Sequence, residues 1–263
     1  MVNMLGIPYD GNSGYLKGSS LAPSRIRLLE RMGCVNPYSE CGINILKGKT
    51  YQDCGDINLK RIEPRDCFNI IEKKISELII GNDKLISIGG DHSITYPIIS
   101  AFSKGYKNIN ILHLDAHADL RKLIHKNPYS HSSTFARIME MGVINSLTQV
   151  GLRTLCEHQR QQIIDFKIEV VEMQNYNLTF LDNLKSPLYI SIDVDVLDPA
   201  YAPGVNYLEP AGMTVRQLIR LIQAIDKEII GADIVEYNPR RDINNMTALV
   251  CNKLIKELIA KMI

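Results

Sequence analysis

The chain has 263 residues, of which 30 are basic and 29 acidic, so its net charge is +1 at neutral pH. This balance gives no reason to expect nucleic acid or an anionic membrane as a partner, and no apolar run approaches the roughly 20 residues that span a bilayer. We expect a single domain over residues 1–263, because no repeat, low-complexity segment or linker marks a boundary. The N-terminal residues are not typical of a signal peptide. The six cysteines form no C-x-x-C pair, which favours free thiols in the cytoplasm.

Short β-rich runs alternate with helical patterns along the chain. The predicted strands are Val2–Ile7, Lys84–Ile88, Ile109–Leu114, Leu147–Val150, Ile168–Val171, Leu188–Val194 and Ala232–Val235. The predicted helices are Pro23–Met32, Asp66–Ile79, Ile94–Ser103, Ser132–Glu140, Glu157–Asp165, Val215–Ile225 and Met246–Ile259. Several of these strands are apolar at nearly every position, which is typical of a parallel sheet covered on both faces. The pattern predicts a three-layer α/β/α fold with a mainly parallel, doubly wound sheet, where ligands bind beyond the carboxyl ends of the strands.

The first polar cluster at a predicted strand end is Gly89-Gly90-Asp91-His92-Ser93. The two glycines permit a tight turn and a close approach of the backbone to its neighbours. Alone this fragment also fits an ordinary turn in which Asp91 or Ser93 caps the following helix.

The second cluster contains Asp115, His117 and Asp119, directly after an apolar strand. If the backbone stays extended, these three side chains point the same way. Their convergence requires a cation, since buried charges cost several kcal/mol unless they are paired or metal-bound. A solvated polar loop fits poorly with the apolar strand before it and with the small spacers Ala116 and Ala118.

The third cluster places Asp193 and Asp195 at the end of another apolar strand, where two adjacent carboxylates again require a counter-charge. Asp198, before Pro199, is interpreted as the start of a turn. The three strand ends together offer four carboxylates, two imidazoles and no thiolate, a set that suits Mn²⁺ better than structural zinc. Six ligands are too many for one tetrahedral ion. They predict two ions with bridging carboxylates that activate water, held by His92, Asp115, His117, Asp119, Asp193 and Asp195.

These motifs resemble those of the ureohydrolases: arginase, agmatinase, guanidinobutyrase and formimidoylglutamase. The resemblance covers nearly the whole chain, from Gly6 to Arg240. It implies an arginase-like fold, homo-oligomers (trimers or hexamers) and two manganese ions per subunit, with Asp115 and Asp193 bridging. His92 and Asp119 complete the first site, and His117 and Asp195 complete the second. A hydroxide between the ions would attack the guanidinium carbon, and the resulting tetrahedral intermediate would collapse to urea and an amine.

The resemblance also assigns residues to the substrate. Glu236 matches the carboxylate that binds the substrate guanidinium, through paired hydrogen bonds, and its alternative is a surface ion pair at a strand end. His131 matches a histidine that transfers a proton or grips the substrate. We place Asp119 with Glu236 and His131 among the catalytic residues as well as among the ligands. His113 is interpreted as a buried histidine that orients a ligand.

The segment from Tyr129 to Met173 looks most like the agmatinase-like branch, which also contains the plant-type arginases. Agmatine, hydrolysed to putrescine, is therefore the first expected substrate among small cationic guanidino compounds. Arginine (giving ornithine), guanidinobutyrate and formimidoylglutamate are alternatives. Arg121 resembles the formimidoylglutamase pattern and could pair with a substrate carboxylate, or it is a solvated loop residue. Two other classes are a single-zinc amide deacetylase of the same architecture, against which the six ligands argue, and a non-catalytic metal-binding protein.

Overall fold

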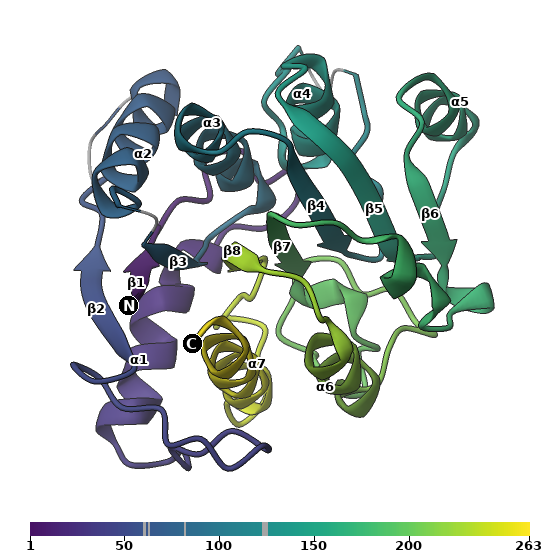
Figure 1. The fold of residues 1–263 in the computed structure, drawn as a ribbon. Coiled ribbons are helices and arrows are strands. Elements are labelled where there is room, and N and C mark those ends of the chain that lie inside the picture. Colours follow the sequence, from purple (N-terminus) through teal and green to yellow (C-terminus); the bar gives the residue numbers. More distant parts are fainter. Residues whose placement is uncertain (60–61, 63, 82, 123–125) are drawn as a thin grey trace.

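The computed structural model describes residues 1–59, 62, 64–81, 83–122 and 126–263, and its centre is one eight-stranded sheet (Figure 1). The strand order is β2-β1-β3-β8-β7-β4-β5-β6, and every neighbouring pair is parallel. The strands are β1 (Val2–Gly6), β2 (Tyr51–Asp56), β3 (Lys84–Ile88), β4 (Ile109–Leu114), β5 (Ile144–Leu152), β6 (Glu169–Glu172), β7 (Leu188–Asp193) and β8 (Ile229–Val235). All residues of β4, β7 and β8 are buried, which explains why these strands are apolar on both faces.

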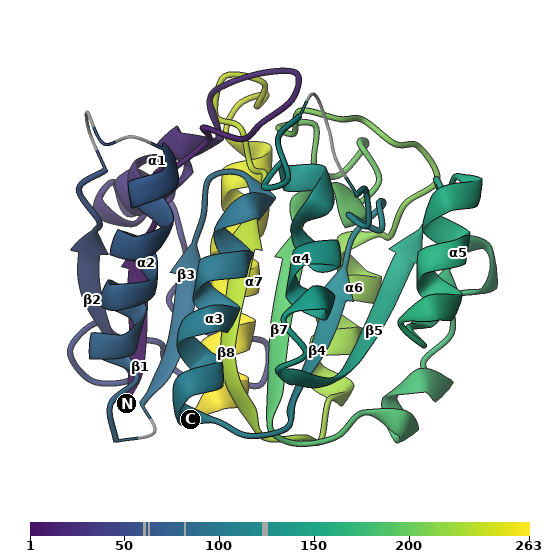
Figure 2. The ribbon, with the colours of Figure 1, turned by 90° about the horizontal axis from the view of Figure 1, so that it is seen from above.

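Helices cover the two faces of this sheet and complete the three layers (Figures 1 and 2). One face carries α1 (Ala22–Arg31), α6 (Val215–Ala224) and α7 (Met246–Met262), which pack in one apolar cluster with β7 and β8. The opposite face carries α2 (Pro64–Leu78), α3 (Thr95–Gly105), α4 (Thr134–Glu140) and α5 (Glu157–Asp165). In the described part of the chain, no helix is both long and apolar enough to cross a membrane.

The predicted fold class is confirmed, but several element boundaries and one strand were wrong. Most predicted boundaries shift by one to three residues; β5, β8 and α7, for example, are longer than predicted. Strand β2 was missed because its sequence, Tyr-Gln-Asp-Cys-Gly-Asp, is polar and does not alternate. It is an edge strand that pairs with β1, and the Arg27 side chain of α1 binds its Asp53 and Asp56. Tertiary contacts, rather than local propensity, form this strand.

The sheet order brings the polar strand ends together. Strands β3, β8, β7 and β4 are consecutive neighbours in the sheet, although they are far apart in sequence. Because they are parallel, their carboxyl ends lie at one edge, where ligands bind in folds of this type. The three clusters identified from sequence lie at the ends of β3, β4 and β7, where Asp193 is the last residue of β7, and Glu236 follows β8. The candidate site therefore lies over the centre of the sheet.

Candidate metal centre and substrate cavity

His92 reaches the centre through a turn that only glycine permits. A Cβ at Gly90 would lie 1.8 Å from the carbonyl oxygen of Tyr9 and so could not be accommodated. The backbone of Gly90 therefore lies directly against the backbone of Tyr9, and the Asp91 amide donates to the Tyr9 carbonyl. The Asp91 carboxylate caps the following turn by accepting from the Ser93 amide, as the capping interpretation of this fragment predicts. Its neighbour His92 is fully buried and points into the cluster.

A hydrogen-bonded chain sets the protonation of the His92 ring. The Ser191 hydroxyl donates to the buried carboxylate of Asp233 at 2.7 Å, so its oxygen must accept from His92 Nε2 at 2.9 Å. With the proton on Nε2, the lone pair of a neutral ring is on Nδ1. Nδ1 is buried and has no hydrogen-bond partner in the described structure. It lies 3.2–3.3 Å from one carboxylate oxygen each of Asp115, Asp119 and Asp193. Burial lowers the pKa of His92, but these three carboxylates reverse this and raise it well above its ordinary value, so Nδ1 attracts either a proton or a metal ion.

The second cluster converges, but not by the extended backbone that we expected. Strand β4 ends at Leu114, and the chain bends at residues 116 and 117. The Asp115 carboxylate accepts from the amide of His117 at 2.6 Å, and Asp119 has a φ of +49°. The amides of Phe135 and Ala136 donate to the Asp119 carbonyl and hold this conformation. A left-handed backbone at a residue other than glycine is unusual, and such residues gather at functional sites.

Asp193 and Asp195 likewise meet without an extended strand. Strand β7 was predicted to run through Val194, but it ends at Asp193, and residues 194–196 form a 3₁₀ turn. The Asp193 carboxylate caps this turn through the Asp195 amide at 2.9 Å. The other oxygen of Asp193 faces His92 Nδ1, while Asp195 Oδ2 lies 3.0 Å from His117 Nδ1. The turn thus directs the two acids to different histidines.

The buried carboxylates of the cluster repel one another, and their charge shifts their own pKa values and that of His117. Burial raises the pKa of Asp193 well above its usual range, and the neighbouring carboxylates of Asp195 and Asp115 raise it further. Burial and the Asp115 carboxylate raise the pKa of Asp195 to about 6. Burial lowers the pKa of His117, but Asp195 and Asp115 reverse this and raise it to about 12. These acids therefore fit the binding of divalent cations, which supply the missing positive charge.

His113 also lies near the cluster, and His92, His113 and Asp115 could between them offer three ligand atoms, as could Asp115, His117 and Asp195. Both ring nitrogens of His113 are already occupied. Its Nε2 donates to Asp115 Oδ2 at 2.8 Å, and its Nδ1 accepts from Gln149 at 2.9 Å. Burial lowers the pKa of His113, which keeps the ring neutral. It is placed to orient Asp115 rather than to bind an ion, in agreement with its interpretation from sequence.

Glu236 and His131 form a buried pair beside the centre. Glu236 has a φ of +64°, and its Oε1 accepts from the His92 amide at 3.0 Å and from His131 Nδ1 at 3.1 Å. Its Oε2 accepts from Asn206 at 3.3 Å. Burial lowers the pKa of His131, but Glu236 reverses this and raises it to about 9. Glu236 is only 4% exposed, so it is not a surface ion-pair residue.

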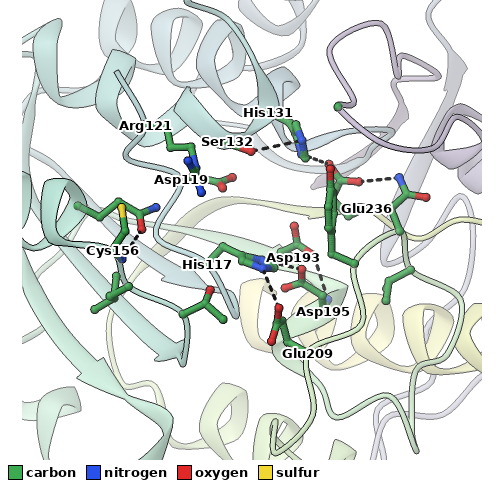
Figure 3. Close-up of a pocket in the computed structure, with 17 residues that line it drawn as sticks. His117, Asp119, Arg121, His131, Ser132, Cys156, Asp193, Asp195, Glu209 and Glu236 are labelled. Carbon is green, nitrogen blue, oxygen red and sulfur yellow. Dashed lines mark hydrogen bonds and ion pairs between the residues drawn. The ribbon is translucent and has the colours of Figure 1, made fainter. Parts of the chain in front are cut away.

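A cavity of about 560 Å³ opens onto this group (Figure 3). Its lining includes His117, Asp119, His131, Asp193, Asp195 and Glu236. In Figure 3, Arg121 and Cys156 lie on the side opposite Glu236. His92 and Asp115 are buried beneath the cavity wall. Asp198 is at a turn, as predicted, where its carboxylate accepts from the amides of Ala200 and Gly212.

Sequence analysis missed several residues of the site. Ser191 and Asp233 are single polar residues within apolar strands, and that contrast was a signal that could have been used. Asn206, Tyr207 and Glu209 line the cavity from the long loop before α6. Their segment carries no pattern that distinguishes it from any other polar loop. Only the fold brings them to the centre.

Comparison with known proteins identifies the family. The model of the arginase family matches residues 1–260. The mitochondrial arginase 1 of Arabidopsis thaliana is 40% identical over 98% of this chain and 80% of its own length. The agmatinase of Bacillus cereus is 31% identical over 98% of this chain and 90% of its own length. The solved structure of arginase from Medicago truncatula superposes with a TM-score of 0.93 at 36% identity, covering 99% of this chain and 87% of that one.

Fold and site together define a metal-dependent α/β hydrolase, and the chain belongs to the arginase family of ureohydrolases. The resemblance stated from the sequence motifs is confirmed. Members of this family hold a binuclear metal centre, and the clustered aspartates and histidines have the donor atoms that such a centre requires.

Proposed function

We propose that this protein is a binuclear manganese hydrolase that releases urea from a guanidino substrate, with arginine as the first candidate substrate. The observation that carries the proposal is the buried Nδ1 of His92, which has no hydrogen-bond partner within the described residues and faces carboxylate oxygens of three aspartates. These residues lie beside a cavity that Glu236 lines. One ion would be held by His92, Asp115, Asp119 and Asp193, and the other by Asp115, His117, Asp193 and Asp195. When bound, such ions lower the pKa of a water molecule and orient it as a nucleophile.

Glu236 is placed to recognise the guanidinium group. Three donors already occupy its carboxylate, from the His92 amide, the His131 ring and the Asn206 side chain. A carboxylate accepts about four hydrogen bonds, so one site remains for an N–H of the substrate. This differs from the paired hydrogen bonds that its charge alone suggested.

His131 holds a proton beside the same carboxylate. Its Nδ1 bonds to Glu236, and its Nε2 lies 3.3 Å from the Ser132 hydroxyl at the cavity wall. The raised pKa of His131 keeps both ring nitrogens protonated at neutral pH, so the Nε2 proton would be available for transfer to the leaving amine while Nδ1 stays bonded to Glu236.

Arg121 favours arginine over agmatine, which the sequence alone had placed first. Arg121 lines the cavity whose other charged lining residues are acids or histidines. A substrate carboxylate would pair with this guanidinium, whereas the second positive charge of agmatine would be repelled by it. The higher identity to proteins named arginase than to those named agmatinase supports the same choice.

The decisive assay measures urea, ammonia and formamide released by manganese-loaded protein from arginine, agmatine, guanidinobutyrate and formimidoylglutamate. We expect urea, with the highest kcat/KM for arginine. Arg121→Gln should raise the KM for arginine about tenfold, the effect of one lost charged hydrogen bond, without weakening agmatine hydrolysis. Lys122→Gln is the matched control, because Lys122 is the neighbouring cation and does not line the cavity.

Different results refute different parts of the proposal. A higher kcat/KM for agmatine would overturn the substrate, and no urea from any of these compounds would overturn the reaction. Glu236→Gln should remove turnover and retain both ions. Two ions per chain, rather than one, exclude the single-zinc deacetylase alternative.

A further inference from the structure

The cavity has an aromatic wall that the proposed mechanism does not use. The Tyr207 ring lies in the loop before α6 and lines the cavity. Its centroid is 5.7 Å from that of His131, with an angle of 22° between the planes, and 6.1 Å from that of His117, at 73°. His131 bonds to Glu236, and His117 pairs with Asp195. Tyr207 therefore spans the space between the carboxylate proposed to bind guanidinium and the proposed metal ligands.

The surroundings of this ring are fixed from two sides. A Cβ at Gly14 would lie 3.3 Å from both the Tyr207 hydroxyl and His131 Nε2, so the N-terminal loop passes close over the pair. The Tyr15 ring of the same loop packs against Tyr207 with centroids 5.8 Å apart. On the other side of the loop that carries Tyr207, the Arg153 side chain donates to six carbonyl oxygens, those of Gly151, Asp195, Val196, Leu197, Glu209 and Pro210. This ties the Tyr207 loop to the turn that carries Asp195.

The charges around the ring define what it can contact. Burial raises the pKa of the Tyr207 hydroxyl, and the carboxylate of Glu236 raises it further, so the ring stays neutral. Because the side chain lines the cavity, its ring face and its hydroxyl can both contact a substrate, and Tyr207→Phe separates the two contacts. An aromatic face attracts a planar cation. The carboxylates of Glu236 and Asp119 near the ring add to this attraction, whereas a proton on the stacked His131 ring opposes it.

We propose that Tyr207 is a positioning residue whose ring face holds the substrate guanidinium against Glu236, discriminating the planar cation from a neutral group of the same shape. This inference rests on the proposed function, because it assigns the guanidinium to the Glu236 end of the cavity. The planar cation would take its N–H contact from the carboxylate and its face contact from the ring. One hydrogen bond alone would leave the guanidinium free to rotate, whereas the carboxylate and the ring together fix its orientation.

The test uses a cation and its neutral counterpart as probes. Guanidinium and urea are both planar and similar in size, and only guanidinium is charged. Binding of each to the manganese-loaded protein is measured by calorimetry, and kcat and KM are measured with the best guanidino substrate. The variants are Tyr207→Phe, which keeps the ring, and Tyr207→Leu, which removes it. Tyr201→Leu is the matched control, since Tyr201 is a partly exposed tyrosine earlier in the same segment and does not line the cavity.

Tyr207→Leu should weaken guanidinium binding about three- to tenfold, between the effects for a cation on an exposed ring and on a desolvated ring, because Tyr207 is partly buried. It should change urea binding less than twofold. Its KM should rise more than its kcat falls, with two metal ions retained. Tyr207→Phe and Tyr201→Leu should match the unaltered protein in every measurement. Equal losses for guanidinium and urea, or unchanged guanidinium binding, would overturn the role of the ring. Guanidinium binding that depends on Tyr207 without any urea release would leave this inference standing and refute only the proposed reaction.

Discussion

The hydrogen-bonded chain behind His92 makes a sharp prediction about metal affinity. Replacing Ser191 with alanine removes the acceptor of the His92 Nε2 proton, in a site where His92, Ser191 and Asp233 are all fully buried. A bound ion needs the Nδ1 lone pair, which forces the ring proton onto Nε2, where it would then have no partner. Without an ion, the carboxylates of Asp115, Asp119 and Asp193 keep a proton on Nδ1, so the ring can release the proton on Nε2 and remain hydrogen-bonded. The penalty therefore falls on the metal-bound form.

The magnitude follows from the loss of one buried hydrogen bond. An unsatisfied buried polar group costs about 1–3 kcal/mol, and about 1.4 kcal/mol corresponds to a tenfold change in affinity. Manganese should therefore bind about 5- to 150-fold more weakly to Ser191→Ala, in line with the effect of losing a group that orients a metal-bound histidine. Asp233 keeps two donors, from Tyr189 and Thr95, so the fold should persist.

The assay is calorimetric titration of Mn²⁺ into chelator-stripped protein. The matched control is Ser87→Ala: Ser87 is an equally buried serine in strand β3 of the same sheet, on the far side of β8 from Ser191, and its hydroxyl has no hydrogen-bond partner within the described structure. It should bind manganese as the unaltered protein does. Unchanged affinity in Ser191→Ala would refute the assigned tautomer, and an equal loss in both variants would show that packing, not the hydrogen bond, is responsible.

Three further predictions concern the centre and its supports. Asp193→Ala should fold but lose turnover and at least one ion per chain, measured by plasma mass spectrometry; full activity would contradict the two-ion assignment. In metal-free protein, the ion pair of His131 with Glu236 should add stability below the unfolded pKa of about 6.5, and this contribution should vanish as the pH rises through about 9. Urea denaturation of the unaltered protein and His131→Asn at pH 6 and pH 10 checks this, and a constant difference between them would refute it. Arg153→Lys has too few donors for six carbonyls, so it should lower the free energy of unfolding by about 1–3 kcal/mol and raise the KM for the substrate. Thermal melts and kinetics measure these two effects. Results that match the unaltered protein would exclude the proposed anchoring of the Tyr207 loop.

Local sequence was enough to predict the fold class and which polar residues converge at the candidate centre. Continuous apolar runs such as β4 and β7 reveal strands buried on both faces, because burial alone selects such composition. Acids and histidines at the ends of those runs are conspicuous for the same reason, since charge beside a buried strand is costly without a partner. Residue type and position along the chain were therefore sufficient to select His92, Asp115 and Asp193, which the structure brings together.

The way these groups meet was decided by tertiary structure. An alternating extended chain was the expected geometry, yet a bend at residues 116–117, the left-handed backbone of Asp119 and a turn after Asp193 produce the convergence. Strand pairing in the order β3-β8-β7-β4 brings segments about a hundred residues apart to one edge. The Ser191–Asp233 contact, the edge strand β2 and the loop that carries Tyr207 depend on the same pairing. Periodicity reports only which face of an element is buried, whereas these features depend on which distant elements become neighbours.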